Sequence, residues 1–289
     1  MPRSRIQRRS PIGGSRAAGV GVLALAVVLI AAVVIGWAVS RPSGGSDSAG
    51  KIGSTFDRFP GPGEGRGAGR SVPGAPDPKA RLVSFVGFVF QDVQRSWQAE
   101  FARAHLAYQP ARLVLFHRAI KSRCGPASTA TGPFYCPLDT SVYLDIGFFR
   151  ALATALDAPG DLAQAYVIAH EMGHHVQTLT GVTQQVMAAE SQNPAIANEL
   201  SIPLELQADC LAGVWAHSTY ERGLLESGDL EEGLNAAAAV GDDRIQEKTV
   251  GRIDPETWTH GTSEQRAGWF LRGFEGGEPA ACDTFGSEL

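Results

Sequence analysis

The stretch that decides the fold is His170-Glu171-Met172-Gly173-His174, an HExxH pentad. On a helix, residues four apart lie one turn apart on the same face, so His170 and His174 can both bind one metal ion beside the carboxylate of Glu171. Small, apolar or unbranched residues continue the helical pattern over residues 162–179. Asp161 is expected to cap this helix, with Gln164 completing a capping box.

A zinc ion that keeps a position open for water needs a third protein ligand, usually from a distant part of the chain. We predict Glu205, within Glu205-Leu206-Gln207-Ala208-Asp209, where the i,i+4 spacing places both carboxylates on one face of a helix. Asp209 is then expected to accept a hydrogen bond from the free ring nitrogen of a ligand histidine and to fix its tautomer. A solvated helix face is the alternative interpretation of the two acids. Third ligands ranked below Glu205 are Glu190, Glu199 and His217.

Further blocks of the chain are Cys124-Gly125, Gly132–Pro137, Val142–Asp145, His260–Arg266 and Cys282–Phe285. Together with the pentad and the Glu205 segment, and in this order, they resemble the bacterial neutral zinc metallopeptidase family, whose members look membrane-anchored with a zincin-like domain. The resemblance covers most of residues 77–286. It implies a zinc-dependent peptidase with one Zn²⁺ per chain, and it leaves the substrate open.

The chemistry expected of these residues is hydrolysis by a zinc-activated water, with Glu171 as the general base that passes a proton to the leaving amine. A donor for the oxyanion is also expected, and Tyr143, Tyr166 or His260 could supply it. The resemblance implies that Val142–Asp145 is an edge strand along which a substrate lies. By its own pattern, the same segment fits an ordinary core strand.

The amino terminus predicts the location. Residues 1–16 form a basic arm, and residues 17–40 contain no charged residue over a length that can cross a bilayer. Positive charge before the span predicts that residues 1–16 stay cytoplasmic and that the remainder lies on the extracytoplasmic side. Ala38-Val39-Ser40 resembles a small-residue cleavage site, but the apolar run exceeds a usual signal-peptide core, so an uncleaved signal anchor in the cytoplasmic membrane is expected. Residues 41–76 are rich in Gly, Pro and Ser and are interpreted as a flexible linker.

Residues 77–289 are long enough for one metallopeptidase domain with its own core. Helical spacing of apolar residues, Phe88 among them, predicts a long first helix packed on the core, and a strand is expected at residues 112–119. Further helices are expected at residues 211–220, 229–246 and 264–274, the last capped by Thr262 or Ser263. The predicted fold class is therefore α+β, mostly helical and zincin-like, with a small sheet.

Four cysteines in an exported domain predict two disulfides, for which three pairings are possible. The Gly-, Ala- and Thr-rich loop between Cys124 and Cys136 favours a local disulfide that closes it, which leaves Cys210 to pair with Cys282. Cysteine-ligated structural zinc is the competing interpretation, but the chain has no CxxC pair.

The leading function is a membrane-anchored zinc metallopeptidase acting on proteins or peptides outside the cytoplasmic membrane. One alternative is a zinc hydrolase of a cell-wall peptide amide, and another is a catalytically silent binding module with a zincin fold. The net charge of −5 argues against nucleic acid as a partner. No GxxxxGK[ST] phosphate loop occurs, so no nucleotide is expected.

Overall fold

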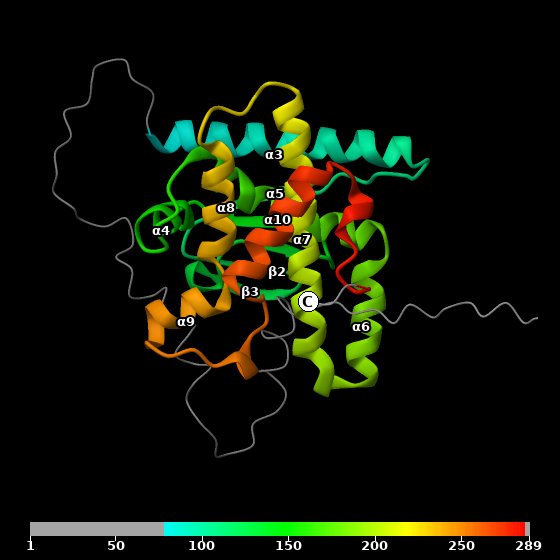
Figure 1. Ribbon diagram of the computed structural model, residues 1–289, viewed down its shortest axis with the longest axis vertical. Coiled ribbons are helices and arrows are strands. Elements are labelled where there is room, and N and C mark those ends of the chain that lie inside the picture. The colour runs from blue at the N-terminus through cyan, green and yellow to red at the C-terminus, as the bar shows by residue number, and fades with distance from the viewer. Residues whose placement is uncertain (1–77, 287–289) are drawn as a thin grey trace, which may run out of the picture.

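The computed structural model describes residues 78–286, which form a mostly helical α+β fold with two small sheets (Figure 1). The predicted basic arm, membrane span and linker, residues 1–76, lie outside the described residues. Among the helices within residues 78–286, none is both long and apolar enough to span a bilayer.

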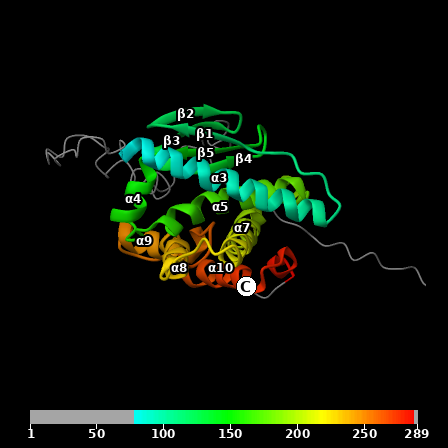
Figure 2. The same cartoon turned by 90° about the horizontal axis from the view of Figure 1, so that it is seen from above.

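The helices surround α5, which lies in the middle of the molecule with the strands along one side and α8 and α10 along the opposite side (Figure 2). The described helices are α3 (Pro78–Arg103), α4 (Phe148–Thr154), α5 (Asp161–Leu179), α6 (Val182–Gln192), α7 (Ala197–Glu221), α8 (Asp229–Ala239), α9 (Asp242–Val250) and α10 (Ser263–Gly276). The short 3-10 turns are η1 (Thr129–Thr131), η2 (Pro194–Ile196), η3 (Pro255–Thr257) and η4 (Pro279–Cys282).

The strands form a three-stranded sheet in the order β1-β5-β4 and a separate hairpin of β2 and β3. They are β1 (Arg112–Phe116), β2 (Ala119–Ser122), β3 (Gly125–Ser128), β4 (Phe134–Cys136) and β5 (Ser141–Asp145). Strand β5 pairs parallel with β1 and antiparallel with β4, and all five of its residues are buried. The expectation of an edge strand at Val142–Asp145 is therefore wrong, because β5 lies between β1 and β4 in the sheet. The pairing with β4 ends at Tyr143, and Leu144 and Asp145 pair with β1 alone.

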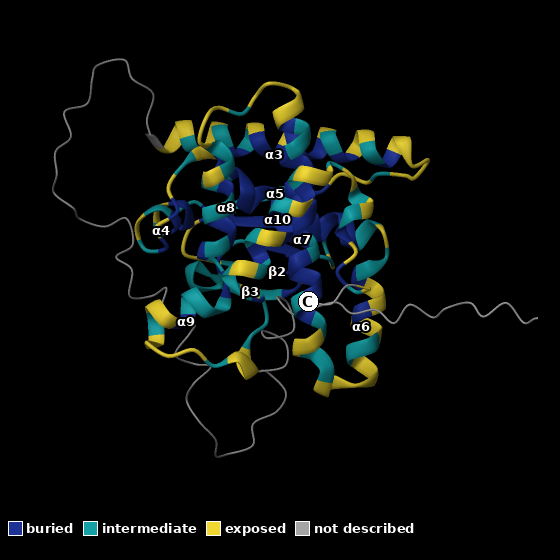
Figure 3. Cartoon of the chain, in the orientation of Figure 1, coloured by how far each residue is buried: buried dark blue, intermediate teal, exposed yellow. Residues whose placement is uncertain are grey.

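Helix α5 is buried nearly all round: 15 of its 19 residues are buried, so it is a central core helix (Figure 3). The predicted capping box is wrong, because the cap position is Gly160 and Asp161 is already helical. Gly160 has φ +122°, and a side chain there would overlap the carboxylate of Glu232. That carboxylate, from α8, accepts a hydrogen bond from the backbone N–H of Leu162 at 3.3 Å and so caps α5 from another element.

Three other predictions can be compared with the structure. The expected helix over residues 229–246 is broken into α8 and α9 at Gly241, where a Cβ would overlap Ser263. Phe88 of α3 is 58% exposed, so its predicted core position is wrong. The disulfides are confirmed, with Cys124 joined to Cys136 and Cys210 joined to Cys282.

Candidate metal centre

The two histidines of the pentad lie on the face of α5 that contacts α7. Between them, Gly173 brings the backbones together, since a Cβ on Gly173 would lie 2.9 Å from the carbonyl oxygen of Ala208. Only glycine allows an approach this close without moving one helix. Ala208 stands directly before Asp209 and one turn after Glu205, so this crossing point sets the histidines of one helix opposite the acids of the other.

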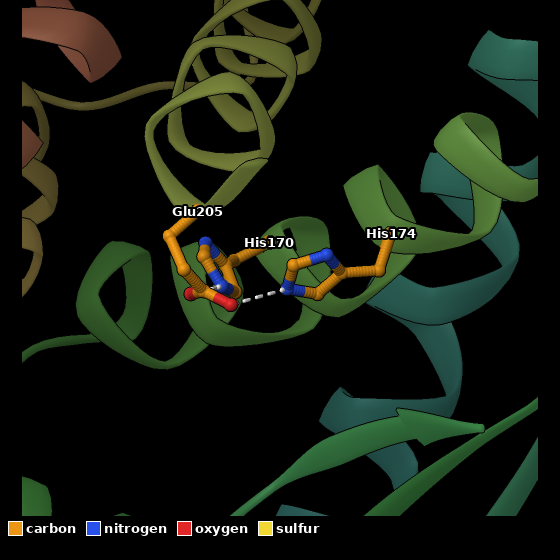
Figure 4. Close-up of side chains that lie close together, drawn as sticks. All are labelled: His170, His174 and Glu205. Carbon is orange, nitrogen blue, oxygen red and sulfur yellow. Dashed lines mark ion pairs between the residues drawn. The ribbon is translucent and has the colours of Figure 1, made fainter. Parts of the chain in front are cut away.

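Glu205 completes a group of three possible metal ligands (Figure 4). Its carboxylate oxygens lie 3.2 Å from Nε2 of His170 and 3.4 Å from Nε2 of His174. One ligand atom from each residue lies within 4.8 Å of the other two, and all three residues are buried. The structure thus brings the predicted third ligand to the pentad.

Three buried atoms in and beside this group make no hydrogen bond in the described part of the chain: Nε2 of His174, Oε2 of Glu205 and Oε2 of Glu171. Oε2 of Glu205 does lie 3.2 Å from Nε2 of His170, but as an ion-pair contact only. Leaving a buried polar atom unpaired costs about 1–3 kcal/mol. A cation between the two imidazoles and the Glu205 carboxylate would satisfy the first two atoms. Two neutral nitrogens and one carboxylate are a donor set typical of zinc with a position left open, so these residues fit that metal.

Asp209 supports His170 from behind. Its Oδ1 lies 2.8 Å from Nδ1 of His170 and accepts the hydroxyl of Tyr166 at 2.5 Å. Burial opposes ionisation of Asp209, but Arg266 and His170 outweigh burial and hold its pKa below the usual value. The ionised carboxylate favours a proton on Nδ1 of His170, which leaves Nε2 free to bind a metal.

Arg266 is a site residue in the block His260–Arg266, and the sequence pattern predicts no role for it. It donates from Nε and Nη2 to the two oxygens of Asp209 at 2.8 and 3.0 Å, and from Nη2 to the hydroxyl of Tyr166 at 3.2 Å. Nη2 also lies 3.8 Å from Oε2 of Glu205. This buried guanidinium holds Asp209 and Tyr166 in one network behind the predicted ligands.

Gln177 is a second residue that the sequence analysis missed, and it supports His174. Its Oε1 lies 2.8 Å from Nδ1 of His174, while its Nε2 donates to the carbonyl of Leu204 at 2.8 Å and to Oε1 of Gln207 at 3.1 Å. These two donations orient the amide so that its oxygen faces the imidazole. The i,i+3 spacing from His174 was the available signal.

The charges around the site favour a cation. Burial disfavours a charge on His170, yet Asp209 and Glu205 raise its pKa to about 10. Burial likewise opposes ionisation of Glu205, but His174 and His170 hold the pKa of Glu205 well below its usual range. The carboxylates therefore favour a positive charge between His170, His174 and Glu205. A proton and a metal ion compete for the same ring nitrogens.

Glu171 is buried beside the same ionisable side chains, and its Oε2 makes no hydrogen bond within the described residues. Burial raises its pKa, against the opposing effects of His170 and His174. A carboxyl group with a raised pKa is suited to accepting a proton and returning it.

The three expected oxyanion donors occupy different environments. Tyr143 donates its hydroxyl to Asp139 at 2.9 Å and stacks on Phe134. Both rings belong to a small buried cluster separate from the main core, which also contains Phe116, Cys124 and Cys136. Tyr166 is 1% exposed and directs its hydroxyl to Asp209. The side chain of His260 is 36% exposed, and its Nδ1 lies 3.1 Å from Oδ1 of Asp242.

His175, the residue after the pentad, is fully buried and makes its hydrogen bonds away from the predicted ligands. Its Nδ1 lies 3.0 Å from the hydroxyl of Tyr135, and its Nε2 lies 2.7 Å from the carbonyl oxygen of Gln109. These contacts tie α5 to the sheet and to the segment before β1.

The fold and the site define a class: a mostly helical α+β protein whose buried HExxH helix faces a glutamate on a second helix. The chain matches the family described as "Putative neutral zinc metallopeptidase" over residues 3–285, and it belongs to this family, which confirms the resemblance. At family level, this membership supports a zinc-dependent hydrolase.

Two relatives show how far the similarity extends. "Uncharacterized protein YpfJ" of Escherichia coli (strain K12) is 46% identical over 221 residues, which cover 76% of each chain. "Uncharacterized protein Rv2575" of Mycobacterium tuberculosis (strain H37Rv) is 46% identical over 189 residues, 62% of this chain and 63% of the relative. No solved structure matches the chain.

Proposed function

We propose that this protein is a zinc-dependent peptidase that hydrolyses peptide bonds. In this proposal His170, His174 and Glu205 hold one Zn²⁺, Glu171 is the general base, and Asp209 positions His170. The observation that carries it is the set of buried, unpartnered atoms of Glu171, His174 and Glu205 beside the pentad. Placement of the HExxH helix next to a small sheet supports the further proposal that the fold is zincin-like.

When bound, zinc supplies Lewis-acid polarisation of a carbonyl and lowers the pKa of water. The protein's own residues do the remaining work. Glu171, held in a buried environment that raises its pKa, takes the proton of the attacking water and delivers it to the leaving amine. Asp209 and Gln177 hold the two imidazoles with a proton on Nδ1, so that both Nε2 atoms face Glu205.

We also propose that the protein is anchored by residues 17–40 and acts on proteins or peptides outside the cytoplasmic membrane. The basic arm and uncharged span of the sequence support the orientation. Two disulfides support an oxidising compartment for the folded part.

A hydrolase of a cell-wall peptide amide would use the same groups, so a substrate screen must include both kinds of amide. A catalytically silent binding module would not need the Glu171 carboxylate. The Oε2 of Glu171 is buried without a hydrogen bond in the described part of the chain, which is unfavourable, so its presence argues against this alternative.

The test uses the full chain in detergent, loaded with one equivalent of zinc, against quenched-fluorescence peptides and soluble cell-wall peptides. Wild type is expected to cleave peptides, and a chelator is expected to stop cleavage. Glu171→Gln should keep its zinc and lose at least about 10²-fold in rate, as expected for loss of a general base. Glu199→Gln, an exposed carboxylate on α7, is the matched control and should retain activity. Full activity in Glu171→Gln would overturn the proposed role.

A further inference from the structure

The first residue of α9 holds the segment that precedes α10. The backbone N–H of Asp242 donates to the carbonyl of Gly261 at 2.9 Å. Its Oδ2 accepts the backbone N–H groups of Thr259 and His260 at 2.7 and 2.6 Å. One aspartate thereby fixes three consecutive residues of a loop.

The same carboxylate also orients the ring of His260. Oδ1 of Asp242 lies 3.1 Å from Nδ1 of His260, and the hydroxyl of Thr259 lies 2.8 Å from the same nitrogen. With its Nδ1–H donated to Asp242, the ring is oriented, and Nε2 carries a proton that it can donate when the ring is an imidazolium, the form that a carboxylate 3.1 Å away favours. Burial opposes protonation of His260, but Asp242 outweighs it and raises the pKa of the imidazole, with a smaller contribution from Glu205 and opposition from Arg266.

This loop lies against the helix that carries Glu205. A Cβ on Gly261 would lie 3.3 Å from Leu206 and 3.4 Å from Ile202, which places the loop directly on α7. Leu206 follows Glu205 directly, and Ile202 lies about one turn before it, so Gly261 contacts the part of α7 that carries Glu205. His260, the residue before Gly261, is therefore near this part of α7 while 36% of its side chain remains exposed to solvent.

The hydroxyls of the other two candidate donors, Tyr143 and Tyr166, already donate to carboxylates of the protein. The hydroxyl of Tyr143 donates to Asp139, and the buried hydroxyl of Tyr166 donates to Asp209 within the Arg266 network. A group that contacts a substrate must be reachable from solvent and must have a free donor. Of these three residues, His260 meets both conditions.

We propose that His260 contacts the substrate at the metal site as an imidazolium, which donates a hydrogen bond from Nδ1 to Asp242 and a second one from Nε2 to the scissile carbonyl oxygen as negative charge develops there. Asp242 is its positioning residue and does not touch the substrate. His260 forms no covalent bond in this step; it stabilises charge only. The assignment rests on the proposed peptidase function.

The experiment compares zinc-loaded, full-length wild type with His260→Ala, His260→Gln, Asp242→Asn and a control, His117→Ala, whose side chain is 51% exposed. Zinc content and thermal unfolding are measured for each variant. Activity is measured as kcat and KM, and affinity is measured for a peptide phosphonate that mimics the tetrahedral intermediate.

Loss of one such donor lowers kcat by about 10²–10³-fold. We expect this loss in His260→Ala, with zinc content and KM unchanged and with phosphonate affinity falling in parallel. Asp242→Asn should show a smaller loss, and His117→Ala none. A purely structural role for His260 would change thermal unfolding without weakening the phosphonate relative to the substrate.

If wild type is active and the kcat values of His260→Ala and His260→Gln lie within about threefold of it, the effect is far below that expected for loss of a donor. This result would overturn the assignment of His260 but would not contradict the peptidase function. Zinc-loaded wild type that cleaves no peptide would overturn the proposed function and this assignment with it. Because Asp242→Asn also removes loop hydrogen bonds, the His260 variants decide the outcome if Asp242→Asn fails to fold.

Discussion

Arg266→Met tests whether the network behind the metal site stabilises the fold. The substitution keeps an aliphatic side chain in α10 but removes the guanidinium that neutralises Asp209. The two side chains are 4% and 0% exposed, and two donors reach the carboxylate at 2.8 and 3.0 Å. Removing one partner of a buried pair costs about 3–5 kcal/mol. Because His170 remains 2.8 Å from Asp209 and keeps part of the compensating charge, the lower end of this range is expected. We expect a loss of this size in metal-free protein at neutral pH, measured by urea unfolding.

The pH dependence of this loss has a defined sign. In wild type, the pKa of Asp209 is held below its usual value. The ionised Asp209 therefore contributes fully to the free energy of unfolding above the unfolded-state aspartate pKa of about 4. This contribution disappears as the pH falls through the lower pKa of the folded state. The difference between wild type and Arg266→Met should narrow in acid.

Two further variants separate charge from packing. Asp209→Asn combined with Arg266→Met removes the unpaired charge and keeps an acceptor for Tyr166, so the double variant should be more stable than Arg266→Met by about 1 kcal/mol or more. Arg272→Met, on the same helix over the ring of Trp269, should cost only about 0.5–1 kcal/mol. The reasoning would be refuted if Arg266→Met lowered the free energy of unfolding by less than about 1 kcal/mol, or if the double variant were less stable than Arg266→Met.

Arg222→Gln should destabilise the protein by about 1–2 kcal/mol at neutral pH, since Arg222 is partly exposed but donates twice to buried Asp92 at 2.7 Å. Arg222 and Trp215 hold the pKa of Asp92 low against burial, so the loss should shrink below about pH 4 in chemical unfolding. Gly273→Ala should cost about 1–3 kcal/mol, because a Cβ there would overlap the carbonyl of Cys210; Gly268→Ala, with open space around it, should gain about 0.5–1 kcal/mol. Gln177→Ala should weaken zinc affinity by about 10-fold or more in a competition assay, and unchanged affinity would contradict its support of His174.

The metal ligands could be predicted because their signal is local. The i,i+4 spacing within His170–His174 and within Glu205–Asp209 fixes each pair on one helical face, and the pentad limits the chemistry. The contact between the two helices at Gly173 could not be predicted from spacing. It follows from the packing of residues far apart in the chain.

The missed features have distant partners. Arg266 binds Asp209 57 residues away, so neither residue predicts the pair by itself. Helix α5 is capped by Glu232, which accepts a hydrogen bond from the backbone N–H of Leu162, 70 residues away in the chain. Asp161 is therefore not needed as a cap. The alternation of β5 was compatible with an edge or a central strand, and only its pairing with both β1 and β4 decides between them.

The most direct test of the central claim is zinc content by mass spectrometry on the folded, full-length protein after remetallation without chelator. We expect one zinc per chain in wild type and in Glu199→Ala, the exposed acid on the same helix as Glu205, and loss of zinc in Glu205→Ala. Full zinc occupancy in Glu205→Ala would contradict the ligand assignment. No stoichiometric zinc in wild type would contradict the metal site itself.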